Sequence, residues 1–207
     1  MKNDQRTGFK LIMLVAIEGL DQSGKETQAQ MLRDHVRAGG HKSRVVSFPD
    51  YGTSIGEEIA RALQGEREYG PETMQLLYVA NRFERKADVE RWNAAGLIVL
   101  FDRYVASSIA YGEAQGLESK WLETLQIYLP QPELTLLLDI APETALARKS
   151  TGRDRYESDF AMLERVRASY LRQAVQSDWV CIDGEQSKAD VAIALAETLD
   201  KWLTNNS

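Results

Sequence analysis

Nine residues near the start of the chain have the spacing of a phosphate-binding loop. Two glycines stand five positions apart and a lysine follows the second, as in a Walker A motif. The loop follows the apolar run Leu11–Ile17 and opens a segment with helical periodicity, so its backbone N–H groups can surround a polyphosphate. Lys25 can then neutralise phosphate charge during phosphoryl transfer. The residues predicted to bind the donor phosphates are Gly19, Leu20, Asp21, Gln22, Ser23, Gly24, Lys25, Glu26 and Thr27.

Glu26 stands directly after the lysine, where such loops usually carry the Ser or Thr that holds magnesium. A carboxylate beside a triphosphate is unfavourable unless a metal lies between them. We therefore hypothesise that Glu26 helps to hold Mg²⁺, directly or through water. The alternative is that Glu26 points away along the helix while Asp21 and Asp102 hold the metal.

An acid and a guanidinium stand side by side at Asp102 and Arg103, directly after the apolar run Leu97–Phe101. Asp102 could anchor magnesium through water, and Arg103 could bind a phosphate with two parallel hydrogen bonds. The alternative is an ion pair between the two neighbours that only closes the strand. Beside a phosphate-binding loop, the functional interpretation is favoured.

Tyr78 and Arg82 are four residues apart in a long helical segment, so they share one face of that helix. A ring and a guanidinium on one face could stack on a base and hydrogen-bond its edge. Helical spacing by itself favours the alternative, in which Tyr78 is a core residue and Arg82 a solvated charge. A further basic segment, 148–157, joins two helical segments, and it is either a closing lid that delivers arginines or a solvated connection.

The elements that position these residues alternate between strands and helices, which predicts an α/β doubly wound sheet whose ligands bind beyond the carboxyl ends of the strands. Two of the apolar runs are nearly continuous, as in parallel strands covered on both faces. The predicted strands are Leu11–Ile17, Arg44–Phe48, Leu97–Phe101, Leu134–Ile140 and Trp179–Ile182. The predicted helices are Thr27–Ala38, Ser54–Leu63, Pro71–Ala94, Val105–Glu113, Ser119–Tyr128, Pro142–Lys149, Ser158–Ser177 and Ser187–Leu203.

The composition is that of an ordinary soluble protein, with 207 residues and 43% hydrophobic content. We expect a loose tail over residues 1–10 and one domain over 11–207. A net charge of −6 argues against a general nucleic-acid binder. No apolar stretch reaches the length of a membrane span, and we expect a cytoplasmic protein. The single cysteine, Cys181, lies in an apolar run and is expected to be buried and inert.

Taken in order, these motifs resemble those of the thymidylate kinase family, a group within the P-loop nucleoside monophosphate kinases. The resemblance covers roughly residues 14–163. It rests on Gly19–Thr27, Phe48-Pro49 with Thr53, Ile55 and Gly56, Ala80-Asn81-Arg82, Asp102-Arg103-Tyr104, Ser107 to Tyr111, Pro142–Arg148 and Arg155-Tyr156-Glu157.

The resemblance implies a P-loop NTPase fold with a short lid at about 149–157. The implied reaction is transfer of the γ-phosphoryl of ATP, with Mg²⁺, to thymidine monophosphate (dTMP). Family members are commonly homodimers. The implied catalytic residues are Asp21, Lys25, Arg103, Arg153 and Arg155, with Asp102 and Glu26 as metal residues. The implied dTMP-binding residues are Asp21, Phe48, Pro49, Tyr78, Arg82, Arg103, Ser107, Tyr111 and Tyr156.

One position indicates a subtype of the family, and another departs from the family pattern. Gln22 fills the place of a possible loop arginine, which indicates the type whose catalytic arginines are in the lid. Tyr51 stands where many relatives carry an arginine toward the acceptor phosphate. The rival interpretations are a kinase for another nucleotide or nucleoside on the same fold, and a nucleotide-binding protein without catalysis.

Overall fold

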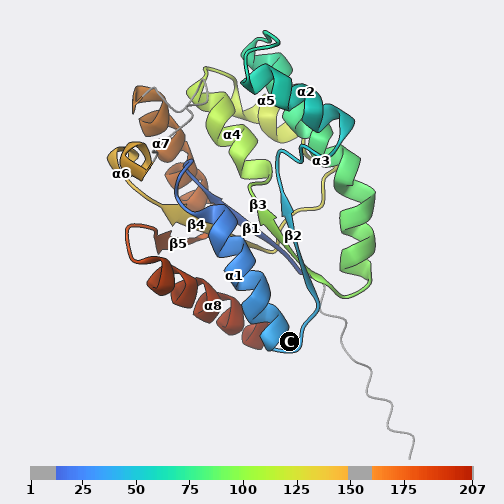
Figure 1. Cartoon of the computed structure of the whole chain (residues 1–207), viewed down its shortest axis with the longest axis vertical. Helices are drawn as coiled ribbons and strands as arrows, with labels where there is room; N and C mark the ends of the chain where they lie inside the picture. Colours follow the sequence, from blue (N-terminus) through green and yellow to red (C-terminus); the bar gives the residue numbers. More distant parts are fainter. Residues whose placement is uncertain (1–12, 149–159, 207) are drawn as a thin grey trace, which may run out of the picture.

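A five-stranded, fully parallel sheet forms the centre of the computed structural model, which describes residues 13–148 and 160–206 (Figure 1). The strand order is β2–β3–β1–β4–β5. The strands are β1 (Met13–Gly19), β2 (Ser43–Ser47), β3 (Ile98–Asp102), β4 (Leu134–Asp139) and β5 (Val180–Asp183). The predicted α/β fold with five parallel strands is confirmed, and every strand begins and ends within two residues of its predicted bounds.

Helices cover both faces of the sheet, because alternate strand residues point to opposite sides. Met13, Val15 and Ile17 of β1 pack with α1 and α8 on one face, whereas Leu14 and Ala16 face the side that carries α3. The helices are α1 (Lys25–Ala38), α2 (Ser54–Leu63), α3 (Pro71–Ala94), α4 (Val105–Ala114), α5 (Ser119–Thr124), α6 (Pro142–Arg148), α7 (Phe160–Gln176) and α8 (Lys188–Asn205).

Two expectations, the end of one helix and the burial of the cysteine, are wrong. The helix α5 ends at Thr124 and not at Tyr128, and the chain then runs in turns to Leu129. The backbone hydrogen bonds beyond Leu125 span three residues, from Gln126 N to Glu123 O and from Leu129 N to Gln126 O, both at 3.0 Å, so this segment forms turns. Cys181 is exposed, because β5 is an edge strand in which only Ile182 is buried.

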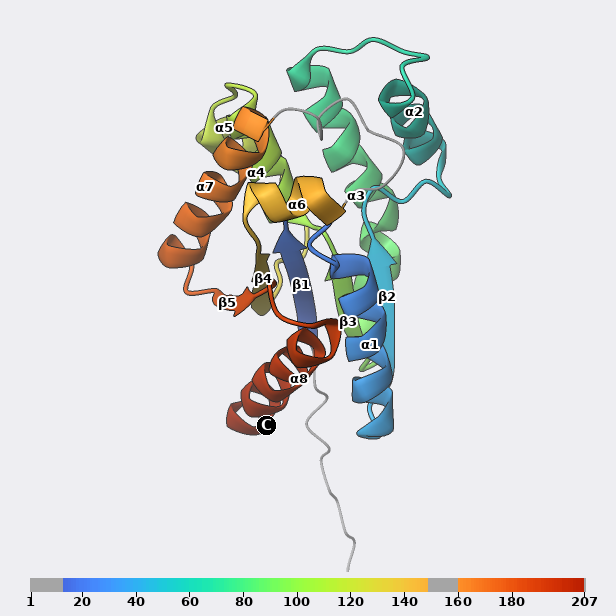
Figure 2. The ribbon, with the colours of Figure 1, turned by 60° about the vertical axis from the view of Figure 1, so that its left-hand side comes forward.

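The carboxyl ends of all five strands lie at one edge of the sheet, below α2, α3 and α4 (Figure 2). The loops after β1, β2 and β3 therefore meet there. The backbone N–H of Arg103 donates to Ile17 O at 3.0 Å, and that of Phe48 donates to Asp102 O at 3.0 Å. Within the described part of the chain, no helix is long and apolar enough to cross a membrane.

Candidate active site

The phosphate-binding loop connects β1 to α1, as its spacing predicts. Gly24 has a φ of 90° and Gly19 a φ of 146°, and both values favour glycine. A Cβ on Gly19 would also lie 2.5 Å from the carbonyl oxygen of Leu138 on the neighbouring strand. The two glycines therefore permit a turn that any larger residue would disrupt.

Lys25 is buried, with 5% of its surface exposed, at the first position of α1. Its ammonium donates hydrogen bonds to Leu20 O at 2.6 Å and Ser23 Oγ at 3.3 Å. Burial, together with the nearby Arg103 guanidinium, lowers the pKa of Lys25 to about 8. The lysine is thus a poorly solvated cation inside the loop that is predicted to bind phosphate.

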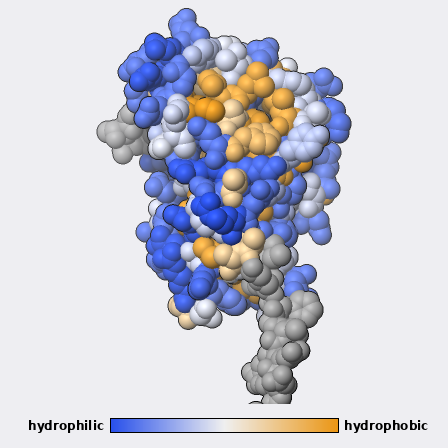
Figure 3. All heavy atoms as spheres, turned by 90° about the vertical axis from the view of Figure 1, so that its right-hand side faces the viewer, coloured by the Kyte–Doolittle hydropathy of each residue, from blue (hydrophilic) through white to orange (hydrophobic). Residues whose placement is uncertain are grey.

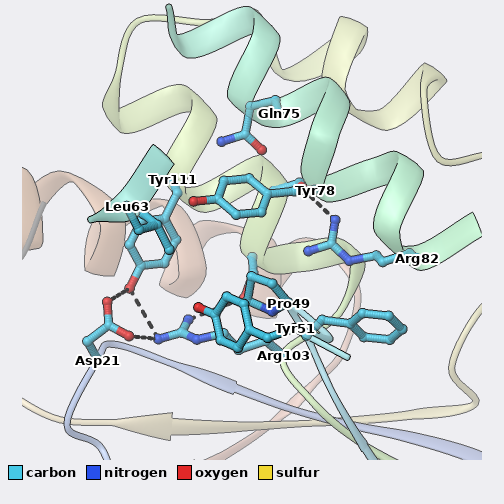
Figure 4. A pocket seen from close by; sticks show the side chains of 12 residues that line it. Asp21, Pro49, Tyr51, Leu63, Gln75, Tyr78, Arg82, Arg103 and Tyr111 are labelled. Carbon is cyan, nitrogen blue, oxygen red and sulfur yellow. Dashed lines mark hydrogen bonds and ion pairs between the residues drawn. The ribbon is translucent and has the colours of Figure 1, made fainter. Parts of the chain in front are cut away.

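Asp21, Arg103 and Tyr111 form one hydrogen-bonded cluster at the mouth of the loop (Figure 4). Arg103 donates to Asp21 Oδ1 and to Gly19 O, and the Tyr111 hydroxyl donates to Asp21 Oδ2 at 2.8 Å. Burial alone would raise the pKa of Asp21, but Arg103 and Lys25 outweigh it and hold the pKa below its ordinary value. Arg103 therefore pairs with Asp21 across the two loops, and the expected alternative of an ion pair with Asp102 is wrong.

A cavity of about 130 Å³ adjoins this cluster, between α3, α4 and the loop after β2 (Figure 4). Every described residue predicted to bind dTMP lines it. These residues are Asp21, Phe48, Pro49, Tyr78, Arg82, Arg103, Ser107 and Tyr111. Tyr51, Leu63, Gln75 and Ser108 complete the lining.

Arg82 is buried, with 4% of its surface exposed, so the alternative of a solvated arginine is wrong. It donates to Ser108 Oγ at 2.7 Å and to Gln126 Oε1 at 3.4 Å, while its Nε has no partner. No carboxylate among the described residues forms an ion pair with it. Burial lowers the pKa of Arg82, which nevertheless stays a cation because an arginine pKa is so high. The cavity thus holds a cationic donor whose hydrogen-bond partners are neutral.

The two residues predicted to hold a metal occupy different environments. Asp102 is half-buried at the end of β3, close enough to Lys25 and Arg103 to interact electrostatically with both. Glu26 is exposed in the first turn of α1, where the helix dipole favours a carboxylate. In the described residues, no group of three or more His, Cys, Asp or Glu side chains could hold a metal ion on its own.

Known proteins with similar sequences belong to one family of kinases. A family model described as thymidylate kinase matches residues 17–194. A thymidylate kinase of Schizosaccharomyces pombe is 33% identical over 86% of this chain and 87% of its own length. A probable thymidylate kinase of Saccharolobus solfataricus is 31% identical over 92% of this chain and 98% of its own. The chain belongs to the thymidylate kinase family.

The fold agrees with this membership. The structure of a thymidylate kinase from Candida albicans superposes with a TM-score of 0.78, at 28% identity, over 91% of each chain. The human thymidylate kinase is 28% identical over 84% of this chain. The likeness therefore spans the loop, the cavity and the helices that join them.

Glu18 is a residue of this thymidylate kinase site that the sequence reasoning missed. It is fully buried at the end of β1 and accepts hydrogen bonds from Tyr104 N at 2.8 Å and Ser107 Oγ at 2.6 Å. The Tyr170 hydroxyl donates to it at 3.2 Å. One carboxylate thus ties the loop after β3, α4 and α7 to the end of β1. A glutamate inside the apolar run 13–19 is the signal that could have identified it.

Arg148 at the end of α6 is a second contact outside the predicted site list. It donates to Gly184 O at 2.9 Å and to Gln22 O at 3.5 Å, which connects the phosphate-binding loop to the turn after β5. The remaining predicted site residues, Arg153, Arg155 and Tyr156, lie outside the described residues.

Proposed function

We propose that this chain transfers the γ-phosphoryl group of ATP to dTMP and releases dTDP. Membership in the thymidylate kinase family supports this activity. The observation that carries the proposal is that Asp21 and Arg103 belong to both halves of the site. Asp21 lies in the donor loop, Arg103 donates to the donor-loop carbonyl of Gly19, and both residues line the acceptor cavity.

On the donor side, the loop amides and Lys25 bind the β- and γ-phosphates. A phosphate near the Lys25 ammonium adds counter-charge to that of Asp21 and Asp102, which does not offset the effect of burial, so the pKa of Lys25 rises when ATP binds. The charge that spreads over the transferring group is then stabilised by donors that are already in position.

On the acceptor side, the base lies against Tyr78 and accepts a hydrogen bond from Arg82. Phe48 and Pro49 form the wall, and Arg103 and Ser107 face the acceptor phosphate, with Tyr111 beside the sugar. Arg82 fits this role because it is a buried cation whose protein partners are neutral. A base carbonyl gives it an acceptor that Ser108 and Gln126 only partly provide.

The chemistry requires positive charge and alignment more than proton transfer. The attacking oxygen belongs to a phosphate that is already ionised at neutral pH, so no general base is needed. Asp21 is itself ionised, because Arg103 and Lys25 hold its pKa low. Its role is to fix the orientation of Arg103, which bridges the acceptor phosphate and the donor loop.

Mg²⁺ fits the residues at this edge of the sheet. Magnesium prefers oxygen ligands, keeps several waters and binds through one or two carboxylates together with substrate phosphates. The half-buried Asp102 has that chemistry and makes no side-chain hydrogen bond within the described residues, so we assign it to magnesium, through water. Glu26, in the first turn of α1, is the second metal residue. Held by these residues, the ion would supply positive charge that offsets the charge of the donor phosphates.

The lid arginines complete the proposal. Arg153 and Arg155 stabilise the transferring phosphoryl group, and Tyr156 contributes to the acceptor site. Gln22 in the loop supports this division of roles, since the loop itself offers no arginine. We also propose that the protein is cytoplasmic and forms a homodimer.

A panel of nucleoside monophosphates assayed with ATP and Mg²⁺ tests the function. We expect kcat/KM for dTMP to exceed that for dCMP and dAMP by at least about tenfold, because Arg82 only donates and these two bases carry an amino group where thymine has a carbonyl. A higher kcat/KM for a purine acceptor would overturn the assignment of dTMP. Absence of turnover with every acceptor would overturn the assignment of a kinase.

A further inference from the structure

Gln75 is a fully buried side chain whose amide has no hydrogen-bond partner. Its exposed fraction is 0%, and neither Nε2 nor Oε1 bonds to any group of the protein. An amide that is removed from water without a partner costs roughly 1–3 kcal/mol. This position in the second turn of α3 could carry leucine or methionine instead, which would avoid that cost.

The other buried glutamines show how unusual this is. Gln126 donates to Val105 O and Leu122 O and accepts from Arg82. Gln173 donates to Ala106 O and Ser169 Oγ, and Gln28 donates to Lys188 O at 2.9 Å. Among the buried glutamines of the described chain, Gln75 alone has both amide atoms unpartnered.

The location of Gln75 indicates what its partner is. Gln75, Tyr78 and Arg82 stand at positions i, i+3 and i+7 of α3, so they form one stripe, and all three line the acceptor cavity. The amide of Gln75 and the guanidinium of Arg82 lie on two sides of the Tyr78 ring (Figure 4). Arg82 Nε is also buried and unpartnered. Two unsatisfied groups thus flank the ring on which the base is proposed to lie.

We propose that Gln75 is a base-recognition residue of the acceptor site, whose amide hydrogen-bonds the base of the bound monophosphate. A pyrimidine with carbonyl groups beside a ring N–H presents acceptors and a donor along one edge, which matches the oxygen and the N–H₂ of an amide. Arg82 only donates, so it selects a carbonyl, and Gln75 adds the neutral partner that Arg82 cannot supply. This inference rests on the proposed function, because it assumes a nucleotide acceptor in this cavity.

Substitution of Gln75 by methionine separates recognition from structure. In Gln75→Met we expect the KM for dTMP to rise about three- to tenfold, the value of one neutral hydrogen bond. The KM for ATP should stay unchanged, because Gln75 belongs to α3 and not to the donor loop. The melting temperature of the ligand-free protein should not fall, because the variant removes an unpaired buried amide. Gln75→Leu provides the same test with a second side chain.

Two controls define the outcome. Gln28→Met alters a buried glutamine outside the cavity and should leave the KM for dTMP unchanged. Deoxyribose 5-phosphate, which has no base, should inhibit the wild-type protein and Gln75→Met with the same inhibition constant. An unchanged KM for dTMP in both Gln75 variants would overturn the proposal. An equal weakening of deoxyribose 5-phosphate would also overturn it, because the site would then be distorted as a whole. Failure of the wild-type protein to phosphorylate dTMP would instead refute the proposed function.

Discussion

Lys25 is the residue whose charge state depends most directly on the donor. Its pKa of about 8 in the free protein lies below the ordinary value of 10.5. Between these values the folded protein holds Lys25 neutral while the unfolded chain holds it charged. The unfolded state therefore binds more protons, and this group makes the ligand-free protein more stable as the pH rises through that window. Bound phosphate stabilises the charged ammonium of Lys25, so the folded protein with bound ATP favours the protonated lysine.

We therefore predict that ATP binding takes up a proton at alkaline pH. At pH 9 the uptake should approach one proton per ATP, and at pH 7 the contribution of Lys25 should vanish, because the lysine is already charged. Calorimetric titration in buffers of different ionisation enthalpy measures this number. Lys42→Met, at a lysine outside the site, should behave like the wild-type protein. Equal proton uptake at both pH values would contradict the assigned role of Lys25.

The single residues of the site were predictable where one element carries them. The nine loop residues follow from their spacing, and so does the shared helix face of Tyr78 and Arg82. The burial of Arg82 in the cavity, however, appears only in the structure. The pairing of Asp21 with Arg103 was not predictable from spacing, because it depends on β1 and β3 being neighbours in the sheet. Gln75 gives no signal in the sequence, since its lack of partners appears only once the surrounding helices are in place.

At the scale of elements, the contact between α2 and the loop after β2 determines the wall of the acceptor cavity. Gly56 lies in the first turn of α2, and its backbone N–H donates to Thr53 Oγ1 at 3.0 Å. A Cβ at this position would lie 1.8 Å from the carbonyl oxygen of Asp50, a backbone atom that cannot move alone. The loop that carries Pro49 and Tyr51 therefore depends on the missing side chain.

Gly56→Ala should displace this loop away from α2. We expect the KM for dTMP to rise about tenfold or more and the unfolding free energy to fall by about 1–3 kcal/mol, as in overpacked sites. The KM for ATP should change much less. Steady-state kinetics and denaturant unfolding measure these effects. Gly70→Ala is the matched control, because a Cβ there meets only the flexible end of Glu72. Identical effects of the two variants on dTMP would refute the role of the contact.

Element bounds were largely predictable, and their arrangement was not. Buried parallel strands such as β3 are continuous apolar runs, so their positions are visible in the sequence. The strand order is not visible there, and Cys181 shows the consequence. An apolar run predicts a strand, but only the position of β5 at the edge of the sheet determines that its cysteine is exposed.

At the scale of the whole molecule, an acidic chain with a net charge of −6 concentrates buried cations in one place. Lys25 and Arg82 are almost fully buried, and Arg103 is held by Asp21 beside them. Anionic substrates therefore supply part of the compensation that the protein lacks. Because such ligands bind only the folded state, both substrates should raise the melting temperature.

We predict that the proposed homodimer forms through the face that carries α2, α3 and α5. Apolar side chains gather on this face (Figure 3). Leu76 of α3 is 46% exposed, and Tyr128, just after α5, is 73% exposed. In a twofold dimer each substitution acts twice, so Tyr128→Glu should weaken association by about a hundredfold or more. Analytical ultracentrifugation should find the wild-type protein dimeric and both Tyr128→Glu and Leu76→Glu shifted toward monomer. Val175→Glu, at an 87% exposed position on α7, should remain dimeric. A monomeric wild-type protein, or dissociation by Val175→Glu alone, would show that this face does not pair with a second copy.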